Sequence, residues 1–524
     1  MTTNKNLKKL PIGIQTFSEI REENYVYVDK TGIALDLIEN GKYYFLSRPR
    51  RFGKSLFVDT LKCIFEGKKE LFTGLAIENA WDWSQKHPVI SISFAGGVTD
   101  SRRLLEERIL NALQILAEQF DVTPRFDNIA DRFEDLIRQV REKTDQKVVI
   151  LVDEYDKPIL DNITHPEIAA QLRECLKDLY SVIKAQDDNI RFVFITGVSK
   201  FSKVSIFSGL NNLDDITLDP KYSTLCGYTQ KDLEQCFGEH LQGYDLKKIK
   251  QWYNGYNWLG EHVYNPFDIL LFISKGYKFR NYWFETGTPT FLIKLIESGK
   301  YFTPAIETIH ASEELIGSFD IEEIAIETLL FQAGYLTIDR ETQVADDIIY
   351  ILKYPNKEVK KSLTDYLLSQ LSQNRVKKQA IKSDLYDALC EMNLDALPLI
   401  FHSFFASIPH DWYRKNNLSG YEGYYASIFY CYFASLGLDV TPEDTTNHGR
   451  IDMTLKMDDA IFIFEFKVVE LVKEENSALE QIKAKRYHEK YETSGDVYLV
   501  GVEFSKEDRN IVGYEWEKVL PRLK

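Results

Sequence analysis

Cysteine is scarce in this chain, with six residues in 524, and none of them forms a CxxC pair or lies at zinc-binding spacing from a histidine. The pattern argues against a disulfide framework and against a structural zinc cluster. We expect the cysteines to be reduced thiols in hydrophobic cores.

Long hydrophobic runs are also missing. Apolar stretches such as residues 424–438 are too short and too rich in tyrosine to span a bilayer. The N-terminal residues lack the apolar core of a signal peptide. The sequence therefore predicts a cytoplasmic protein without a membrane partner.

Basic residues are fewer than acidic ones: the chain has 64 Lys and Arg and 80 Asp and Glu, which gives a net charge of -16. This balance counts against a surface that coats nucleic acid with basic residues, although a local basic channel is compatible with it. What the chain does have is apolar material: 44% of its residues are hydrophobic and 13% aromatic. A chain of this length and composition predicts about two to four domains.

The first two hundred residues alternate between apolar runs and helical periodicities, which predicts an α/β fold with a parallel sheet. The helix expected over residues 55–67 has apolar residues at i, i+4, i+7 and i+8 and ends at a glycine. The expected strands are 43–46, 88–95, 147–154 and 190–197, and the other expected helices are 101–120 and 132–144.

The rest of the chain has a different pattern. Residues 219–415 are mostly helical and aromatic, with expected strands at 334–338 and 348–355 in a small winged module. Residues 416–524 predict a compact α/β domain with helices at about 420–436 and 475–492 and a strand at 496–504. We therefore expect three domains, at residues 1–218, 219–415 and 416–524.

The stretch LSRPRRFGKSL contains the second half of a phosphate-binding loop, G-x-x-x-x-G-K-[ST], but has Arg48 where the first glycine belongs. It lies between an expected strand and an expected helix, so Gly53 and the helix N-terminus can face phosphate oxygens. Lys54 would reach the terminal phosphates and Ser55 would ligate Mg²⁺.

The proline after Arg48 fixes its own φ, removes a donor and changes how this loop opens. Arg50 and Arg51 follow it in the sequence. They either replace lost phosphate contacts or pair with acids of this acidic chain, and the residues alone do not choose between these alternatives.

Polar residues end two further buried strands. Asp153 would hold the metal directly or through water, and Glu154 would polarise the attacking water. Thr196, at the end of the next buried strand, would sense the γ-phosphate or position that water. Together with the loop, these residues predict a nucleoside-triphosphate site.

A second group of charged residues lies near the C-terminus. If strands 449–457 and 460–467 pair through a turn at Asp458 and Asp459, Asp452 lies directly opposite Glu465. Cross-strand Cβ atoms are roughly 4.5 to 5.5 Å apart, so the two carboxylates can share a divalent metal. Lys467 points the same way as Glu465 and would orient water or stabilise charge at a phosphodiester. The alternative is a surface ladder of ion pairs.

The motifs YVDKT, RPRRFGKS, VDEYDKP, ITGVSKFS, WYNGY, NYWFETGTPTFL and YPNKEV resemble, in this order, the bacterial AAA-like ATPase family that is fused to a PD-(D/E)XK nuclease-like domain. The resemblance covers almost the whole chain. It implies a P-loop NTPase fold of the ASCE/AAA-like type and ATP as the nucleotide, and the arginine and proline of the loop fit the family.

The D...E-x-K layout resembles the nuclease core, with Ile451 where the motif name has proline. The resemblance implies an upstream metal-binding acid, for which Glu422 matches by position and Glu443 less well. It also implies a glutamine-bearing helix after the E-x-K strand. Gln481 fits, with Lys485 and His488 on the same expected helical face, where they would contact the substrate backbone or form a solvated charged face.

We therefore expect an ATPase with a Mg²⁺-dependent nuclease domain that cuts nucleic acid under the control of ATP. The expected cofactors are ATP and Mg²⁺, and the expected partner is nucleic acid, with DNA favoured over RNA. The sequence is also compatible with a homo-oligomer. The alternative is a regulatory ATPase whose C-terminal domain binds nucleic acid or a partner without cutting.

Overall fold

The chain divides into two compact units. Unit 1 holds Met1–Leu295 and His310–Asn356, and unit 2 holds Ile296–Ile309 and Lys357–Lys524. The region expected between residues 219 and 415 is thus shared between the units, and the boundary expected after residue 415 lies outside the described residues. The computed structural model describes residues 7–200, 206–207, 210–284, 303–317, 325–372, 375–406, 422–469, 477–491 and 494–519.

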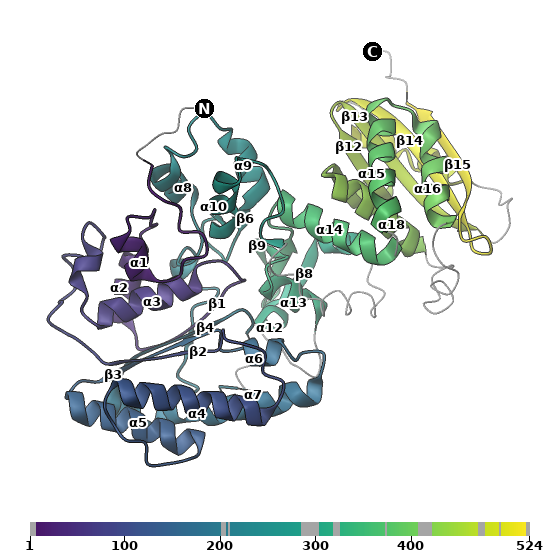
Figure 1. Cartoon of the computed structure of the whole chain (residues 1–524). Helices are drawn as coiled ribbons and strands as arrows, with labels where there is room; N and C mark the ends of the chain where they lie inside the picture. Colours follow the sequence, from purple (N-terminus) through teal and green to yellow (C-terminus); the bar gives the residue numbers. More distant parts are fainter. Residues whose placement is uncertain are drawn as a thin grey trace. The chain divides into compact units, whose positions relative to one another are not determined.

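Unit 1 contains the parallel sheet that the sequence predicts (Figure 1). The first elements of the unit are α1 (Phe17–Glu22), α2 (Thr31–Asn40), β1 (Tyr43–Ser47), α3 (Lys54–Phe65), β2 (Val89–Ser93), α4 (Arg102–Gln119), α5 (Ile129–Thr144), β3 (Val148–Asp153), α6 (Lys157–Leu160), α7 (Pro166–Ala185), β4 (Ile190–Gly197) and β5 (Asp214–Asp215). The strand order is β2-β3-β4-β1-β5, and every neighbouring pair is parallel.

Helices cover both faces of this sheet: α3 lies on one face, and α4, α5 and α7 lie on the other (Figure 1). β1 and β3 are buried along their whole length, which explains their unbroken apolar sequences. Parallel strands that share one direction also end at one edge of the sheet. The loops after β1, β2, β3 and β4 therefore meet there, where ligands bind in open α/β sheets.

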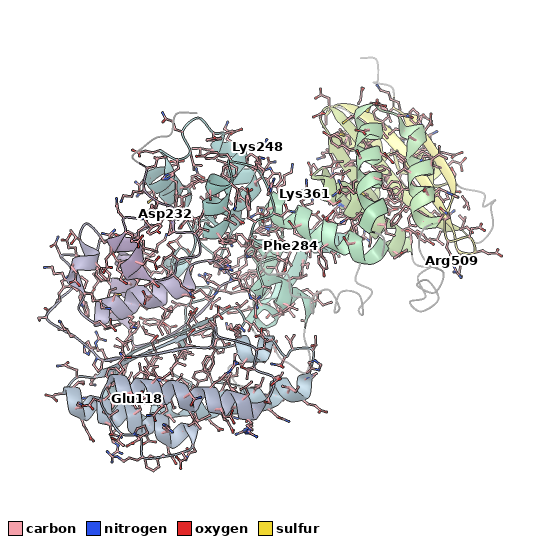
Figure 2. All side chains as sticks on the ribbon, viewed as in Figure 1. Glu118, Asp232, Lys248, Phe284, Lys361 and Arg509 are labelled. Carbon is pink, nitrogen blue, oxygen red and sulfur yellow. The ribbon has the colours of Figure 1, made fainter. Side chains whose placement is uncertain are left out.

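The rest of unit 1 surrounds a second core of aromatic and aliphatic residues that includes Tyr253, Phe272 and Tyr282. Its elements are α8 (Gln230–Phe237), α9 (Leu246–Tyr253), β6 (Asn254–Tyr256), β7 (Val263–Tyr264), α10 (Pro266–Ser274), β8 (Ile309–Ser312), α12 (Glu313–Gly317), α13 (Ile326–Gln332), β9 (Thr337–Val344) and β10 (Asp347–Lys353). Asp232, labelled in Figure 2, completes the capping box of α8 and pairs with Lys30 at 2.7 Å. β10 corresponds to the strand expected at 348–355, whereas β9 begins at Thr337 and shares only the end of the strand expected at 334–338. The two strands pair antiparallel.

Unit 2 contains a five-stranded mixed sheet in the order β11-β12-β13-β14-β15. Its elements are α14 (Lys357–Ser372), α15 (Arg375–Cys390), α16 (Leu397–Ala406), α18 (Glu422–Leu436), β11 (Asp439–Thr446), β12 (Gly449–Met457), β13 (Ala460–Val469), α19 (Ala478–Lys485), β14 (Asp496–Ser505) and β15 (Ile511–Lys518). Only β13 and β14 pair in parallel. Strands β11 and β15, at the two edges, were not expected from the sequence.

The alternation of side chains along β13 determines which helix packs on which face. Phe464 and Phe466 face α18, with ring centroids 5.5 Å from Phe433 and 5.0 Å from Phe429, respectively. Ile461 and Ile463 belong to the opposite face, in a cluster with Leu479 and Ile482 of α19. Glu465 follows the same alternation and belongs to the α19 face.

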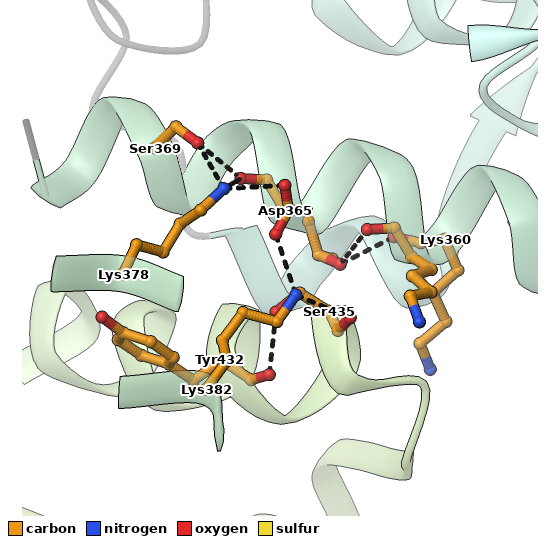
Figure 3. A network of polar contacts seen from close by, with 9 residues as sticks. Lys360, Asp365, Ser369, Lys378, Lys382, Tyr432 and Ser435 are labelled. Atoms are coloured by element: carbon orange, nitrogen blue, oxygen red, sulfur yellow. Dashed lines mark hydrogen bonds and ion pairs between the residues drawn. The ribbon is translucent and has the colours of Figure 1, made fainter. Parts of the chain in front are cut away.

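A buried polar network joins α14, α15 and α18 in unit 2 (Figure 3). The carboxylate of Asp365 accepts hydrogen bonds from Lys378 at 2.7 Å and from Lys382 at 2.9 Å. Lys378 also donates to Ser369, and Lys382 to the carbonyl of Ser435 at the end of α18. The ammonium groups therefore have partners, as buried charges require.

All six cysteines are free thiols, as expected, and four of them are buried, whereas Cys390 is exposed. Among the described residues, no helix combines the length and the apolar character needed to cross a membrane.

Candidate functional site

A cavity of about 800 Å³ opens beside the parallel sheet of unit 1. It is lined by residues that follow β1, β2, β3 and β4, in agreement with the edge predicted from strand direction. Its apolar part is lined by Pro11, Ile14, Tyr27, Val28, Leu225, Tyr228, Pro266, Phe267 and Leu270. The lining thus combines charged and hydrophobic residues, and the volume lies in the usual range of small-molecule sites.

The phosphate-loop residues line the charged side. Gly53 has a φ of 94°, a left-handed conformation that favours glycine, and is followed directly by the first residue of α3. Lys54 and Ser55 begin that helix and line the cavity. The Lys54 ammonium donates to the carbonyls of Arg48 and Pro49 at 2.9 Å each. Burial lowers the pKa of Lys54, and the carboxylate of Asp153 opposes this shift.

Arg50 and Arg51 are both exposed and line the cavity. Neither forms an ion pair with an acid in the part of the chain that is described, and whether they contact phosphates stays a prediction. The guanidinium of Arg51 lies 4.9 Å from the ring centre of Phe267, and Arg51 has a φ of 69°. Such backbone strain is common at ligand sites.

The two acids after β3 have different surroundings. Asp153 is buried, and its carboxylate accepts a hydrogen bond from the backbone N–H of Glu154 at 3.0 Å. Glu154 has a φ of 53° and lines the cavity. Burial, and then the charge of Asp153, raise the pKa of Glu154, which suits a group that accepts a proton. Asp153 is not among the residues that line the cavity, so it lies one layer deeper, close to Lys54.

Thr196 does not reach the cavity, which corrects the expectation that it would contact the γ-phosphate or water. Its side chain is fully buried, and its hydroxyl donates to the carbonyl of Leu46 at 2.9 Å across the sheet. Val198, which directly follows β4, lines the cavity. A side chain inside a central strand is directed by sheet packing, which its position at the strand end did not reveal.

Asp156 was missed by the sequence reasoning. It is buried, lines the cavity and accepts hydrogen bonds from the backbone N–H groups of Val198 and Ser199. It therefore fixes the segment after β4 against the segment after β3. The third acid of VDEYDKP was the available signal, but nothing in the sequence pairs it with a strand more than forty residues later.

In unit 2, β12 and β13 pair in the register that places Asp452 opposite Glu465. Their observed partners include Met453 with Phe464 and Met457 with Ala460, and extending this register by one residue gives the expected pair. The carboxylate of Asp452 accepts a hydrogen bond from the backbone N–H of Phe466 at 2.8 Å. The turn predicted at Asp458 and Asp459 is thus confirmed, and it has two residues.

The electrostatics of this pair favour a bound cation. Burial raises the pKa of Asp452 to about 6, and burial followed by the charge of Asp452 raises the pKa of Glu465 to about 8. Glu465 is 3% exposed, and its Oε2 atom is buried without a hydrogen-bond partner. Two adjacent carboxylates with an open oxygen fit a divalent metal and disfavour the surface ion-pair ladder.

The third acid of the predicted metal site is not in place. Among the described residues, no set of three His, Cys, Asp or Glu side chains is arranged to hold a metal ion. Partial burial, and then Asp452, raise the pKa of Glu422 at the start of α18, so this acid is near the pair. Glu443 forms an ion pair with Arg450 at 3.1 Å. The charge of Glu443 also raises the pKa of Asp452, so both acids lie near the pair.

Lys467 follows Glu465 by two residues on β13 and is half-buried. Gln481 of α19 donates to Glu465 Oε1, so the helix expected to contact the substrate contacts the candidate metal-binding acid instead. The helix expected over 475–492 is also shorter. α19 ends at Lys485, Arg486 has a φ of 49°, and His488 lies in a separate 3-10 turn, so Lys485 and His488 do not share one α-helical face.

Three comparisons relate this chain to other proteins. Residues 11–207 match the family described as "Predicted AAA-ATPase", and residues 420–514 match the PD-(D/E)XK nuclease superfamily. A protein of Azotobacter chroococcum mcd 1, described as "Uncharacterized protein in vnfD 5'region", is 52% identical over 98% of this chain and 99% of its own length. No solved structure matches. The chain belongs to this predicted AAA-ATPase family and carries a C-terminal domain of the PD-(D/E)XK nuclease superfamily.

Proposed function

We propose that the protein binds and hydrolyses ATP in the cavity of unit 1 and cuts nucleic-acid phosphodiesters at Asp452 and Glu465 under the control of ATP. The observation that supports nucleic-acid cleavage is the buried Oε2 atom of Glu465, which has no hydrogen-bond partner and lies near a second carboxylate. DNA is the favoured substrate and the cytoplasm the favoured location.

In the ATPase site, Lys54, Arg50 and Arg51 bind the phosphates, and the backbone of Gly53 lies against them. Ser55 and Asp153 would hold Mg²⁺, and a hydroxyl beside a carboxylate is a donor set that suits this ion. Glu154 accepts the proton of the attacking water, because its raised pKa brings its basicity closer to the working pH.

In the nuclease site, Asp452 and Glu465 would hold Mg²⁺, with Glu422 as a further acid that approaches when substrate binds. The metal would offset the charge that develops on the phosphodiester. Lys467 orients the attacking water or stabilises that charge, and Gln481 holds the Glu465 carboxylate in place through its hydrogen bond to Oε1.

The experiment is a cleavage assay with the full-length protein on single-stranded DNA, double-stranded DNA and RNA, with Mg²⁺ and with or without ATP. We expect cleavage that Glu465→Ala abolishes. Glu515→Ala is the matched control, since it removes an exposed acid of β15 in the same sheet. The absence of cleavage on every substrate, with ATP present, contradicts the nuclease proposal.

The second candidate is a regulatory ATPase whose C-terminal domain binds nucleic acid or a partner without cutting. The observation that favours it is the missing three-acid set among the described residues. Retained binding of nucleic acid by the wild type, without cleavage in the same assay, supports this candidate.

A further inference from the structure

The start of the phosphate loop is held by a buried arginine. Arg48 is 1% exposed, and its guanidinium lies 4.2 Å from the ring centre of Trp258. It donates to the backbone carbonyls of Ser47 and Thr217, both at 2.8 Å. It also donates to the carbonyl of Tyr222 at 3.4 Å, so hydrogen bonds to carbonyls and a desolvated cation–π contact hold this buried cation together.

The following loop residues are anchored to the same region of unit 1. The indole N–H of Trp283 donates to the carbonyl of Arg50 at 3.1 Å, and the N–H of Gly227 donates to the carbonyl of Phe52 at 3.1 Å. The buried ring of Phe52 lies 5.4 Å from the Trp258 ring, edge to face. Residues between 217 and 283 therefore hold the loop at three successive points.

This anchoring determines where Lys54 stands. Its ammonium donates to the carbonyls of Arg48, which contacts Trp258, and of Pro49, the next residue of the loop. An ordinary loop obtains its opening turn from a glycine, which this loop lacks. Here the start of the loop is held by contacts with residues between 217 and 283, which lie outside the loop.

We propose that Arg48 and Trp258 are positioning residues of the nucleotide site: their contact replaces the missing glycine turn and holds the loop in the shape that accepts phosphates. The proposal rests on ATP binding in the cavity. It follows that the region around Trp258 controls nucleotide affinity, and that any partner which displaces Trp258 weakens nucleotide binding.

The test compares two substitutions of Trp258 that both leave an apolar side chain at this position. Trp258→Phe keeps an aromatic face over Arg48, whereas Trp258→Leu keeps apolar bulk without that face. We expect Trp258→Leu to weaken Mg-ATP binding about tenfold and Trp258→Phe to weaken it less than about threefold, in line with the strength of a desolvated cation–π contact. Isothermal titration calorimetry on the full-length protein measures both, after circular dichroism has shown that each variant is folded.

The outcomes separate this proposal from the proposed function. If the wild type binds no nucleotide, the ATP site itself is refuted, and the proposal with it. A second outcome is that the wild type binds ATP, that Lys54→Ala weakens this binding, and that Trp258→Leu has the affinity of the wild type. In that case only the positioning role is refuted. Should Trp258→Leu not fold, Arg48→Met removes the cation that lies against Trp258 and keeps an unbranched side chain. A loss of affinity in that variant supports the proposal, and unchanged affinity overturns it.

Discussion

The two sites of this protein hold their charges in opposite ways. In unit 1, the buried ammonium of Lys54 donates to two carbonyls of its own loop, so it has partners before any phosphate arrives. In unit 2, a buried oxygen of Glu465 has no hydrogen-bond partner and faces a second carboxylate. We therefore expect Lys54 to exchange its carbonyl partners for phosphate on binding, and we expect a bound cation to stabilise the second site.

The Asp365 network of unit 2 sharpens this contrast. It also contains buried charges, yet two lysines face one carboxylate with short hydrogen bonds. A charged group is retained inside a fold either because it is paired or because it serves a ligand. Asp365 belongs to the first kind, and we propose that Glu465 belongs to the second.

The largest expected effect concerns the acid at the edge of the unit 1 cavity. Glu154→Gln should slow ATP hydrolysis about a thousandfold while ATP binding persists, because the amide cannot accept the proton of the attacking water. Steady-state hydrolysis and calorimetric binding measure the two quantities. Equal hydrolysis in variant and wild type would remove Glu154 from the chemistry, and Asp161→Asn serves as the control acid on the same wall.

The next effect tests the exchange of partners by Lys54. Lys54→Ala should reduce ATP hydrolysis about a hundredfold, since the cationic donor that exchanges its carbonyl partners for the phosphates is lost. Lys69→Ala, at an exposed position just beyond α3, is the matched control. Nucleic-acid cleavage without ATP should stay unchanged in Lys54→Ala. A variant that hydrolyses ATP normally would mean that phosphates bind elsewhere in the cavity.

A smaller effect tests the paired network. Asp365→Asn should lower the free energy of unfolding by about 2 kcal/mol, because two buried lysines lose their acid. Against the opposing effect of burial, the hydrogen bonds from Lys378 and Lys382 lower the pKa of Asp365. Its contribution is therefore present at neutral pH and is lost as the pH falls below about 4. Urea unfolding at pH 7 and pH 3.5 measures this, and an equal difference at both pH values would contradict it.

The smallest effect has the opposite sign. In EDTA at pH 7, Glu465→Gln should raise the free energy of unfolding by about 1 kcal/mol. Burial raises the pKa of Glu465 to about 8, so folding of the wild type must protonate this carboxyl, a cost that the amide avoids. Mg²⁺ should stabilise the wild type and leave Glu465→Gln nearly unchanged. Thermal unfolding with and without Mg²⁺ decides this, with Glu515→Gln as control. If the wild type does not respond to Mg²⁺, the carboxylate pair is not a metal site under those conditions.

The sequence by itself determined several local elements and the register of one hairpin, β12–β13. Apolar runs and helical periodicity predicted β1, β3, β4 and α3, because these signals act over a few residues and are read from composition alone. The position of Asp452 opposite Glu465 was also predictable. A two-residue turn and the alternation of a strand fix a hairpin through covalent geometry, without help from the rest of the fold.

The tertiary structure alone decided the surroundings of these elements. Arg48 bonds to the carbonyl of Thr217, 169 residues away, and Thr196 turns into the sheet and not into the cavity. The break after α19 and the division of the middle region between two units also depend on packing. Such contacts join residues whose separation in the chain carries no local signal, so only the folded chain shows why this phosphate loop begins with an arginine.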